Sequence, residues 1–290
     1  MSPDGLSVDV EDYYHVEAFA DQISPEDWIR YPSRVVDNTR RVLELFAELG
    51  AKATFFVLGH VAENQPVVVR DILAAGHEVG CHSYGHRRIH TLTPEQFRED
   101  TRRALRVIQD AGGREVLGYR APTFSVVRQT LWAIPILAEE GFLYDSSVYP
   151  VVHDLYGMPQ APRHLYRWEF PGGSLIELPP LTVSLLGRNL PVGGGGYLRN
   201  LPMWYTRWAL RRIRQHENRP LLIYLHPWEV DPAQPRLEGS WKSKVRHYRN
   251  LEVMEERLRE VIRGGRFRPL KEVLQAYRDR DAIPAYPLQA

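Results

Sequence analysis

The sequence has almost no cysteine and no excess of charge. Its 290 residues include a single cysteine, Cys81, which excludes an internal disulfide framework and any metal site built from cysteines alone. Lysine and arginine number 37 against 36 acidic residues, which gives a formal net charge of +1. This balance gives no reason to expect a nucleic-acid partner.

Long hydrophobic runs and leader-like segments are also missing. The longest apolar stretches, such as 221–225, are far shorter than the roughly 20 residues that cross a bilayer as a helix. Residues 1–5 show no basic region followed by an apolar run, so no transmembrane segment or secretory signal is expected. We therefore expect a cytoplasmic protein that works in the cytoplasm or at the inner face of the cytoplasmic membrane.

A phosphate-binding glycine motif is absent as well. The run of glycines at 193–196 lacks the lysine and the serine or threonine of a P-loop. Four glycines in a row favour a flexible loop or a close approach of another segment, and we place this loop near the functional site. Phosphoryl transfer is therefore a poor fit to this sequence.

Short apolar segments alternate with amphipathic ones along most of the chain. The pattern predicts strands at 6–10, 53–58, 78–82, 116–119, 142–144, 175–178 and 220–225. It predicts helices at about 37–49, 67–75, 93–111, 129–140, 204–215, 251–262 and 270–277. The first helix would be capped by Asp37 or Asn38, and the third by a capping box of Thr93 and Gln96. Such alternation indicates a parallel sheet, either doubly wound or closed as a barrel.

Polar residues gather where the predicted strands end. Five clusters follow strands: Asp9 with Glu11 and Asp12; His82 with His86; Arg120 with Pro122; Asp145 with its serines; and His226 with Trp228 and Glu229. Each cluster alone has an ordinary explanation, such as a turn, a cap or a surface ion pair. Because active sites lie at the carboxyl ends of parallel strands, the five together indicate one shared site.

The side chains in these clusters suit metal-assisted hydrolysis. Two imidazoles and one carboxylate form a ligand set for zinc or a similar divalent ion, and three ligands leave positions open. A bound metal lowers the pKa of water from 15.7 toward about 7. A second carboxylate can accept the proton of that water, and a further histidine can protonate the leaving group. This set of side chains therefore predicts metal-assisted hydrolysis of an amide or an ester.

The motifs, in their order along the chain, resemble those of the polysaccharide deacetylase family. This group shares the nodulation-type chitooligosaccharide deacetylase domain and is carbohydrate esterase 4-like. The resemblance rests on the segment Gly76 to His86, on Arg120-Ala121-Pro122 and on Leu225-His226-Pro227. The later segments Pro227 to Pro232 and Arg246-His247-Tyr248 are similar to a subfamily found at bacterial exopolysaccharide and exosortase loci.

The resemblance implies an α/β fold, a single-domain distorted (β/α) barrel of about seven strands. We expect the barrel to occupy 1–230 and a helical C-terminal extension to occupy 231–290. One divalent ion is implied, Zn²⁺ first, with Co²⁺ or Ni²⁺ as alternatives. Carried over by position, the resemblance makes Asp9 the general base, His82 and His86 metal ligands, Arg120 the residue that holds Asp9, Asp145 a groove or tuning residue, and His226 the general acid.

The third metal ligand is left open by a departure from the family pattern. The family commonly has two adjacent aspartates, a base and then a ligand, whereas this chain reads Asp9-Val10-Glu11-Asp12. We favour Glu11 as the ligand and keep Asp12 as the alternative. For substrate contacts we expect Pro122, Tyr197 and Trp228, because aromatic rings stack on pyranose rings.

The expected activity is removal of acetyl groups from N-acetylhexosamine units of a polysaccharide or of its lipid-linked precursor. The expected partner is accordingly an acetylated glycan or a lipid-linked oligosaccharide. Two alternatives stay open at this point. The first is an amidase that uses the same metal site on a small ureide-like or formamide-like molecule. The second is an inactive barrel that only binds glycans.

Overall fold

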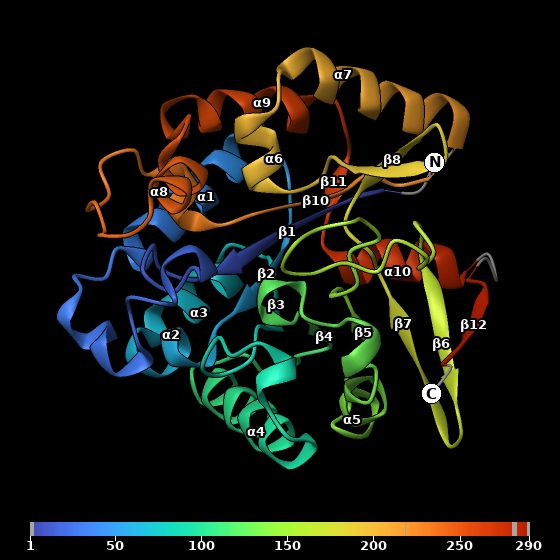
Figure 1. Ribbon diagram of the computed structural model, residues 1–290, viewed down its shortest axis with the longest axis horizontal. Coiled ribbons are helices and arrows are strands. Elements are labelled where there is room, and N and C mark those ends of the chain that lie inside the picture. The colour runs from blue at the N-terminus through green and yellow to red at the C-terminus, as the bar shows by residue number, and fades with distance from the viewer. Residues whose placement is uncertain (1–2, 218, 280–282, 289–290) are drawn as a thin grey trace.

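A curved and mostly parallel sheet forms the centre of the protein (Figure 1). The structure is a computed structural model and describes residues 3–217, 219–279 and 283–288. The main sheet contains β1 (Asp4–Val10), β2 (Thr54–Val57), β3 (Glu78–Cys81), β4 (Gly118–Tyr119), β5 (Tyr144–Asp145), β6 (Tyr166–Phe170), β7 (Gly173–Glu177), β10 (Leu222–Leu225), β11 (Phe267–Arg268) and β12 (Ala285–Pro287). A separate hairpin pairs β8 (Thr182–Leu185) with β9 (Arg188–Pro191).

Seven neighbouring strands of this sheet run parallel, in the order β10-β1-β2-β3-β4-β5-β7. The segment that follows β7 nearly closes the curve. The Leu178 N–H donates to the Asp145 carbonyl at 2.8 Å, and the Leu181 N–H donates to the Leu222 carbonyl at 3.0 Å. This segment therefore connects β5 with β10, and the expectation of a distorted seven-stranded barrel is confirmed.

Helices cover the outside of the sheet (Figure 1). They are α1 (Val35–Glu48), α2 (Gly59–Asn64), α3 (Pro66–Ala74), α4 (Pro94–Asp110), α5 (Ala133–Glu139), α6 (Gly195–Asn200), α7 (Met203–Arg212), α8 (Trp241–Tyr248), α9 (Met254–Arg263) and α10 (Leu270–Arg278). Their apolar faces, for example Phe97, Ala104 and Ile108 of α4, pack into one large core with β1, β2 and β3. None of the helices in these ranges is both long and apolar enough to cross a membrane.

The two predicted helix starts have different outcomes. The capping box of α4 is confirmed, because the Gln96 N–H donates to Thr93 Oγ1 at 3.2 Å and the Thr93 N–H donates back to Gln96 Oε1 at 3.0 Å. The predicted cap of α1 at Asp37 or Asn38 is wrong. The helix begins two residues earlier, at Val35, and its first N–H groups are bound by a carboxylate from a distant part of the chain, Asp12.

The parallel strands bring the predicted clusters to one edge of the sheet. β1, β3, β4 and β10 end at Val10, Cys81, Tyr119 and Leu225. The next residues with polar side chains are Glu11, His82, Arg120 and His226. Because these strands point the same way, side chains that are far apart in sequence converge on one place.

Candidate active site

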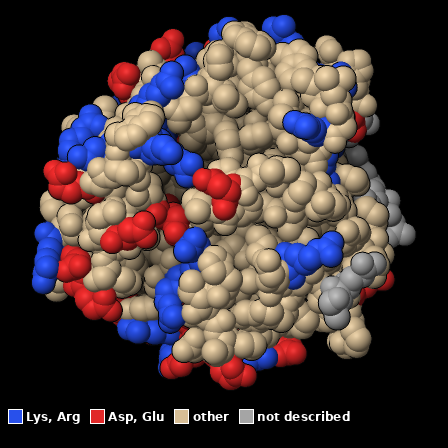
Figure 2. Space-filling view, in the orientation of Figure 1, with Lys and Arg blue, Asp and Glu red and all other residues tan. Residues whose placement is uncertain are grey.

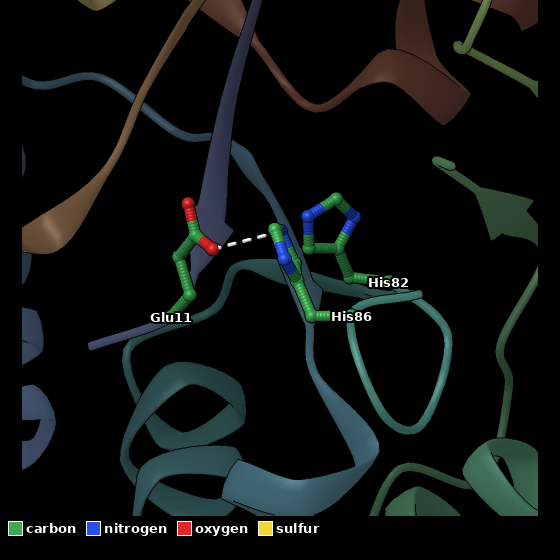
Figure 3. A group of neighbouring side chains, drawn as sticks. All are labelled: Glu11, His82 and His86. Carbon is green, nitrogen blue, oxygen red and sulfur yellow. Dashed lines mark ion pairs between the residues drawn. The ribbon is translucent and has the colours of Figure 1, made fainter. Parts of the chain in front are cut away.

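Three potential metal ligands lie together at the ends of β1 and β3. One ligand atom from each of Glu11, His82 and His86 falls within 4.8 Å of the others (Figure 3). His86 Nε2 lies 2.9 Å from Glu11 Oε2, and the three side chains are almost wholly withdrawn from solvent. A carboxylate and two imidazoles at this spacing suit a divalent ion such as zinc.

The protein also orients His82 in the way expected of a metal ligand. Its Nδ1 lies 2.8 Å from the carbonyl of Arg120, so Nδ1–H donates there and Nε2 is left for an ion. Burial lowers the pKa of His82 to about 4, which keeps the imidazole neutral near pH 7. The donor set, its burial and this backbone hydrogen bond fit a divalent metal.

A buried ion pair holds the carboxylate of Asp9 beside this cluster. Arg120 donates to Asp9 Oδ1 at 2.7 Å and to the Ser7 hydroxyl at 2.8 Å through the same nitrogen. Its other nitrogens donate to the carbonyl and the hydroxyl of Ser146 at 2.9 and 2.7 Å. Because each guanidinium nitrogen of Arg120 donates at least one hydrogen bond, the group is held in one position, and it fixes Asp9 in turn.

His226 closes the site on the opposite side. Its Nε2 lies 3.2 Å from Glu11 Oε1 and 4.0 Å from Asp9 Oδ2. Burial alone would lower the pKa of His226, but its hydrogen bond with Glu229 and the nearby charge of Glu11 raise this pKa to about 9. An imidazolium between carboxylates can donate a proton to a group in the cavity.

Strained backbone surrounds this arrangement. Four residues without the freedom of glycine adopt positive φ here: Ser83 at 63°, His86 at 52°, Thr123 at 54° and Phe124 at 48°. Such conformations cost of order 1–3 kcal/mol each and persist where the surrounding structure enforces them. Their concentration around one cavity is typical of a functional site.

Comparison with known proteins agrees with this geometry. Residues 27–137 match the family profile described as polysaccharide deacetylase. This stretch is therefore similar to polysaccharide deacetylases, and we refer to it as the deacetylase domain. Residues 146–275 match a second profile, described only as a domain of unknown function (DUF3473). The first match contains His82 and His86, and the second contains His226.

Relatives of the deacetylase domain include proteins from distant organisms. The chain is 32% identical over 133 residues to a peptidoglycan deacetylase of Helicobacter pylori, which is 45% of this chain and 44% of that protein. It is 30% identical over 110 residues to a peptidoglycan deacetylase-like protein of Gibberella zeae, which is 37% of this chain and 32% of that protein. The match thus spans less than half of these relatives.

One solved structure shares the whole fold. It belongs to a Mycobacterium smegmatis protein described as a candidate polysaccharide deacetylase, with 21% sequence identity and a TM-score of 0.63. The superposition covers 98% of this chain and 93% of that one. The barrel therefore extends through both matched regions, including the one of unknown function.

The second matched region supplies two site residues to which the sequence assigned no role. Glu229 Oε2 accepts from the backbone N–H of His226 at 3.0 Å and lies 3.2 Å from His226 Nδ1. Arg199, from α6, donates to Glu229 Oε1 at 2.7 Å and to the carbonyls of His247 and Arg249 at 3.0 and 2.7 Å. The signal for Glu229 was its position three residues after His226. Nothing local pointed to Arg199.

The buried Arg199 decides the charge of Glu229. Burial would raise the pKa of this carboxyl, but the guanidinium of Arg199 lowers it to about 2. The ionised Glu229 then holds the Nδ1–H of His226, so Nε2 of the same ring faces Asp9 and Glu11. This pair therefore orients the ring of His226.

The glycine run at 193–196 allows this packing. A Cβ on Gly195 would overlap the carboxylate of Glu229, and one on Gly194 would meet the ring of Tyr224. A Cβ on Gly193 would come within 2.5 Å of the Leu222 carbonyl. The prediction of a tightly approached loop near the site is therefore confirmed, and the partners are β10 and Glu229.

A cavity of about 470 Å³ opens onto these residues. Its floor includes Asp9, Glu11, His86 and His226, and its walls are largely aromatic: Phe124, Tyr156, Tyr197, Tyr224 and Trp228. Tyr197 and Trp228 thus lie where substrate contacts were expected. Pro122 does not line the cavity, because it is the buried first residue of a short helical turn whose next two residues face the space instead.

Asp12 lies outside the metal cluster. Its Oδ2 accepts from the Ser33 hydroxyl at 2.7 Å and from the Arg34 and Val35 N–H groups at 2.9 and 3.2 Å. Since the free N–H groups at a helix N-terminus attract a carboxylate, Asp12 serves as the missing cap of α1. The geometry therefore favours Glu11 as the third ligand over Asp12.

Asp145 also lies away from the cavity. Its carboxylate accepts from the Ser147 hydroxyl and neighbours the buried carboxyl of Glu177. Burial raises the pKa of Asp145 to about 6 and that of Glu177 well above its ordinary value, so the two carboxyls retain a proton. The expected role of Asp145 in the groove does not fit this position, and the residue beside the histidine ring of the site is Glu229.

Proposed function

We propose that this protein removes acetyl groups from N-acetylhexosamine units of a polysaccharide or of its lipid-linked precursor. The observation that carries the proposal is the convergence, on one cavity, of the cluster Glu11–His82–His86 with Asp9 on one side and His226 on the other. His82 and His86 lie in the first matched region and His226 in the second, whereas Asp9 and Glu11 precede both. The deacetylase domain match and the deacetylase relatives support the same reaction class.

Glu11, His82 and His86 would hold the divalent ion, and the donor set favours zinc. When bound, such an ion supplies Lewis acidity toward the acetyl carbonyl and toward water. Asp9 accepts a proton from the attacking water, and its ion pair with Arg120 keeps the acceptor oxygen aimed at the cavity. His226 Nε2 then donates a proton to the departing nitrogen. The carbon–nitrogen bond breaks, and the products are acetate and a free amine.

The cavity walls support a sugar substrate. Aromatic rings at Tyr197 and Trp228 present flat apolar surfaces to a pyranose ring. The Tyr156 and Tyr197 hydroxyls lie 2.9 Å apart and leave hydrogen-bonding capacity for sugar hydroxyls. A few placed polar groups on an apolar wall are typical of a specific ligand site.

The direct test is acetate release. The purified chain is loaded with zinc or cobalt and incubated with acetylated chitooligosaccharides and with peptidoglycan fragments. We expect acetate and free amino groups in equal amounts, and we expect the Asp9→Asn variant to release about 10²- to 10⁴-fold less while it still binds metal. A metal-loaded protein that releases no acetate from any acetylated glycan would contradict the proposal.

The largely apolar lining of the cavity suggests a second candidate. His153, Leu155 and Tyr156 line the same cavity as Glu11 and His86, and its volume of about 470 Å³ also admits a small amide. The same assay with small ureides and formamides distinguishes the two substrates. Turnover of these molecules together with inertness toward every glycan would assign the site to a small-molecule amidase.

A further inference from the structure

One side of α8 combines apolar and basic side chains and faces solvent. Trp241 and Val245 are one helical turn apart and are 71% and 44% exposed. The opposite side of the helix carries His247, which is buried and stacks on Trp228 with ring centroids 4.2 Å apart. Because His247 anchors the inner side, the Trp241 side points permanently outward.

The same helix lies in a strongly basic segment near the cavity. Residues 236–249 contain Arg236, Lys242, Lys244, Arg246 and Arg249 against a single acidic residue, Glu238. Lys242 and Arg246 are exposed and one turn apart, so they lie beside the two apolar side chains. Figure 2 shows lysine and arginine side chains gathered at the upper left, over α8 and beside a hollow in the surface.

A third exposed apolar residue belongs to a loop that lies next to α8. Val152 is 85% exposed, in the loop that follows β5. Arg246 of α8 lies 3.6 Å from Asp154 of this loop, and both Arg246 and His153 line the cavity. We call the set of Val152, Trp241, Lys242, Val245 and Arg246 the mouth face.

We propose that the mouth face docks onto a lipid bilayer surface that carries anionic headgroups. A tryptophan and two valines with no cover, flanked by lysine and arginine, are the composition of an interfacial membrane contact. The rings and aliphatic groups enter the headgroup region, and the basic side chains stay with the lipid phosphates. Residues 236–249 carry a net positive charge, so they attract an anionic surface and would repel a cationic one.

Two features favour lipid over a soluble glycan on this face. Exposed valines offer a sugar ring neither a flat aromatic surface nor a hydrogen bond, whereas lipid accepts them. The face also borders the cavity mouth, so a docked protein would hold its cavity at headgroup level. That position suits an acetylated glycan on a lipid carrier. The docking itself does not depend on the proposed activity, because vesicle binding is measured without turnover.

The test is co-sedimentation with vesicles. The full chain is mixed with vesicles of phosphatidylcholine and phosphatidylglycerol, or of phosphatidylcholine alone, at low and at high salt. We expect binding to the mixed vesicles only, weakened by salt because the attraction is screened. Lys242→Glu should lower the partition coefficient about fivefold or more. The double variant Trp241→Ala/Val245→Ser should lower it about tenfold or more, because the buried apolar area is lost.

A matched control lies on another face of the protein. Trp204 of α7 is 67% exposed, close to the exposure of Trp241, and Arg211 of the same helix is also exposed. Trp204→Ala and Arg211→Glu should leave vesicle binding unchanged. Equal loss in these controls, binding that persists in the double variant, or no binding of the unmodified chain would overturn the proposal. A dimer in solution that the double variant dissociates would instead assign the face to a second copy.

Discussion

The two matched regions of this chain build their parts of the site in different ways. In the deacetylase domain, His82 and His86 are four residues apart and follow directly from the end of β3. In the second region, the partners of His226 come from separate elements, since Glu229 follows β10 and Arg199 lies in α6. One region presents its functional residues through local sequence, and the other assembles them through packing.

This contrast shows how a region of unknown function can complete the candidate site. The deacetylase domain and β1 bring the candidate metal ligands and Asp9, but the ring of His226 is held by a buried carboxylate and its counter-ion. Both are supplied between residues 146 and 275. The second region therefore contributes charged residues of the candidate site as well as residues that line the cavity. The following variants test the separate contributions of the two regions.

The largest effect is expected at the metal cluster. Glu11→Gln removes a ligand charge, so we expect loss of bound metal and a fall in kcat of about a thousandfold or more, because the ion contributes several kcal/mol to the barrier. Metal content by atomic emission and acetate release are the measurements. The matched control is Asp12→Asn, which weakens only the cap of α1 and should cost about 0.5–2 kcal/mol of stability. If Asp12→Asn also lost its metal, the assignment of Glu11 would fail.

Next in size are the histidine and its carboxylate in the second region. His226→Ala should lower kcat by about 10²- to 10⁴-fold while the metal content stays unchanged. Glu229→Gln keeps the shape but weakens a charged hydrogen bond, so we expect a loss of about tenfold to a hundredfold. The kcat of an activated aryl acetate, whose leaving group needs no proton, should fall much less in both variants. Equal losses on both substrates would contradict the assignment of His226 as the acid.

A smaller effect is expected in the glycine run. Gly195→Ala places a methyl group against the Glu229 carboxylate, so we expect about 1–3 kcal/mol of destabilisation and reduced kcat, measured by denaturant unfolding and acetate release. Gly196→Ala is the matched control, because a Cβ there meets nothing within 4 Å. Indistinguishable behaviour of the two variants would show that α6 does not pack tightly on Glu229.

The smallest effect is expected at the buried pair of carboxyl groups formed by Asp145 and Glu177. Because the pKa of Asp145 is raised to about 6, its contribution to stability is fully present below the ordinary pKa of 3.8. That contribution is lost as pH rises through about 6. Asp145→Asn mimics the protonated form, so unfolding free energies should vary less between pH 4 and 7 in this variant. The exposed Asp110→Asn should follow the unmodified chain, and a parallel profile for Asp145→Asn would refute the retained proton.

Much of the fold could be predicted from local patterns. The strand at Leu6 to Val10, the capping box at Thr93 and the alternation of strands and helices were all present in the sequence, and the structure confirms them. The stretch from 151 to 192 was the least predictable, and it forms the β6–β7 and β8–β9 hairpins. Proline and aromatic residues hid the alternation that would mark strands there.

The candidate site divides along the same line. Residue types and their positions at predicted strand ends were enough to predict Asp9, His82, His86 and His226 as site residues, because the carboxyl ends of parallel strands share one edge of the sheet. The choice between Glu11 and Asp12 depended on which carboxylate reaches the N-terminus of α1. The role expected of Asp145 belongs instead to Glu229, because Glu229 is the acidic residue that lies beside the imidazole of His226.

By itself, the sequence determined the chemical inventory and the alternation that makes a parallel barrel, because periodicity and residue type are local properties of the chain. Tertiary structure alone decided which carboxylate meets the metal cluster, which one caps a helix and which one orients His226. The physical reason is that a carboxylate has the same chemistry everywhere. Its role depends on the cation, N–H group or imidazole that packing places within about 3 Å of it.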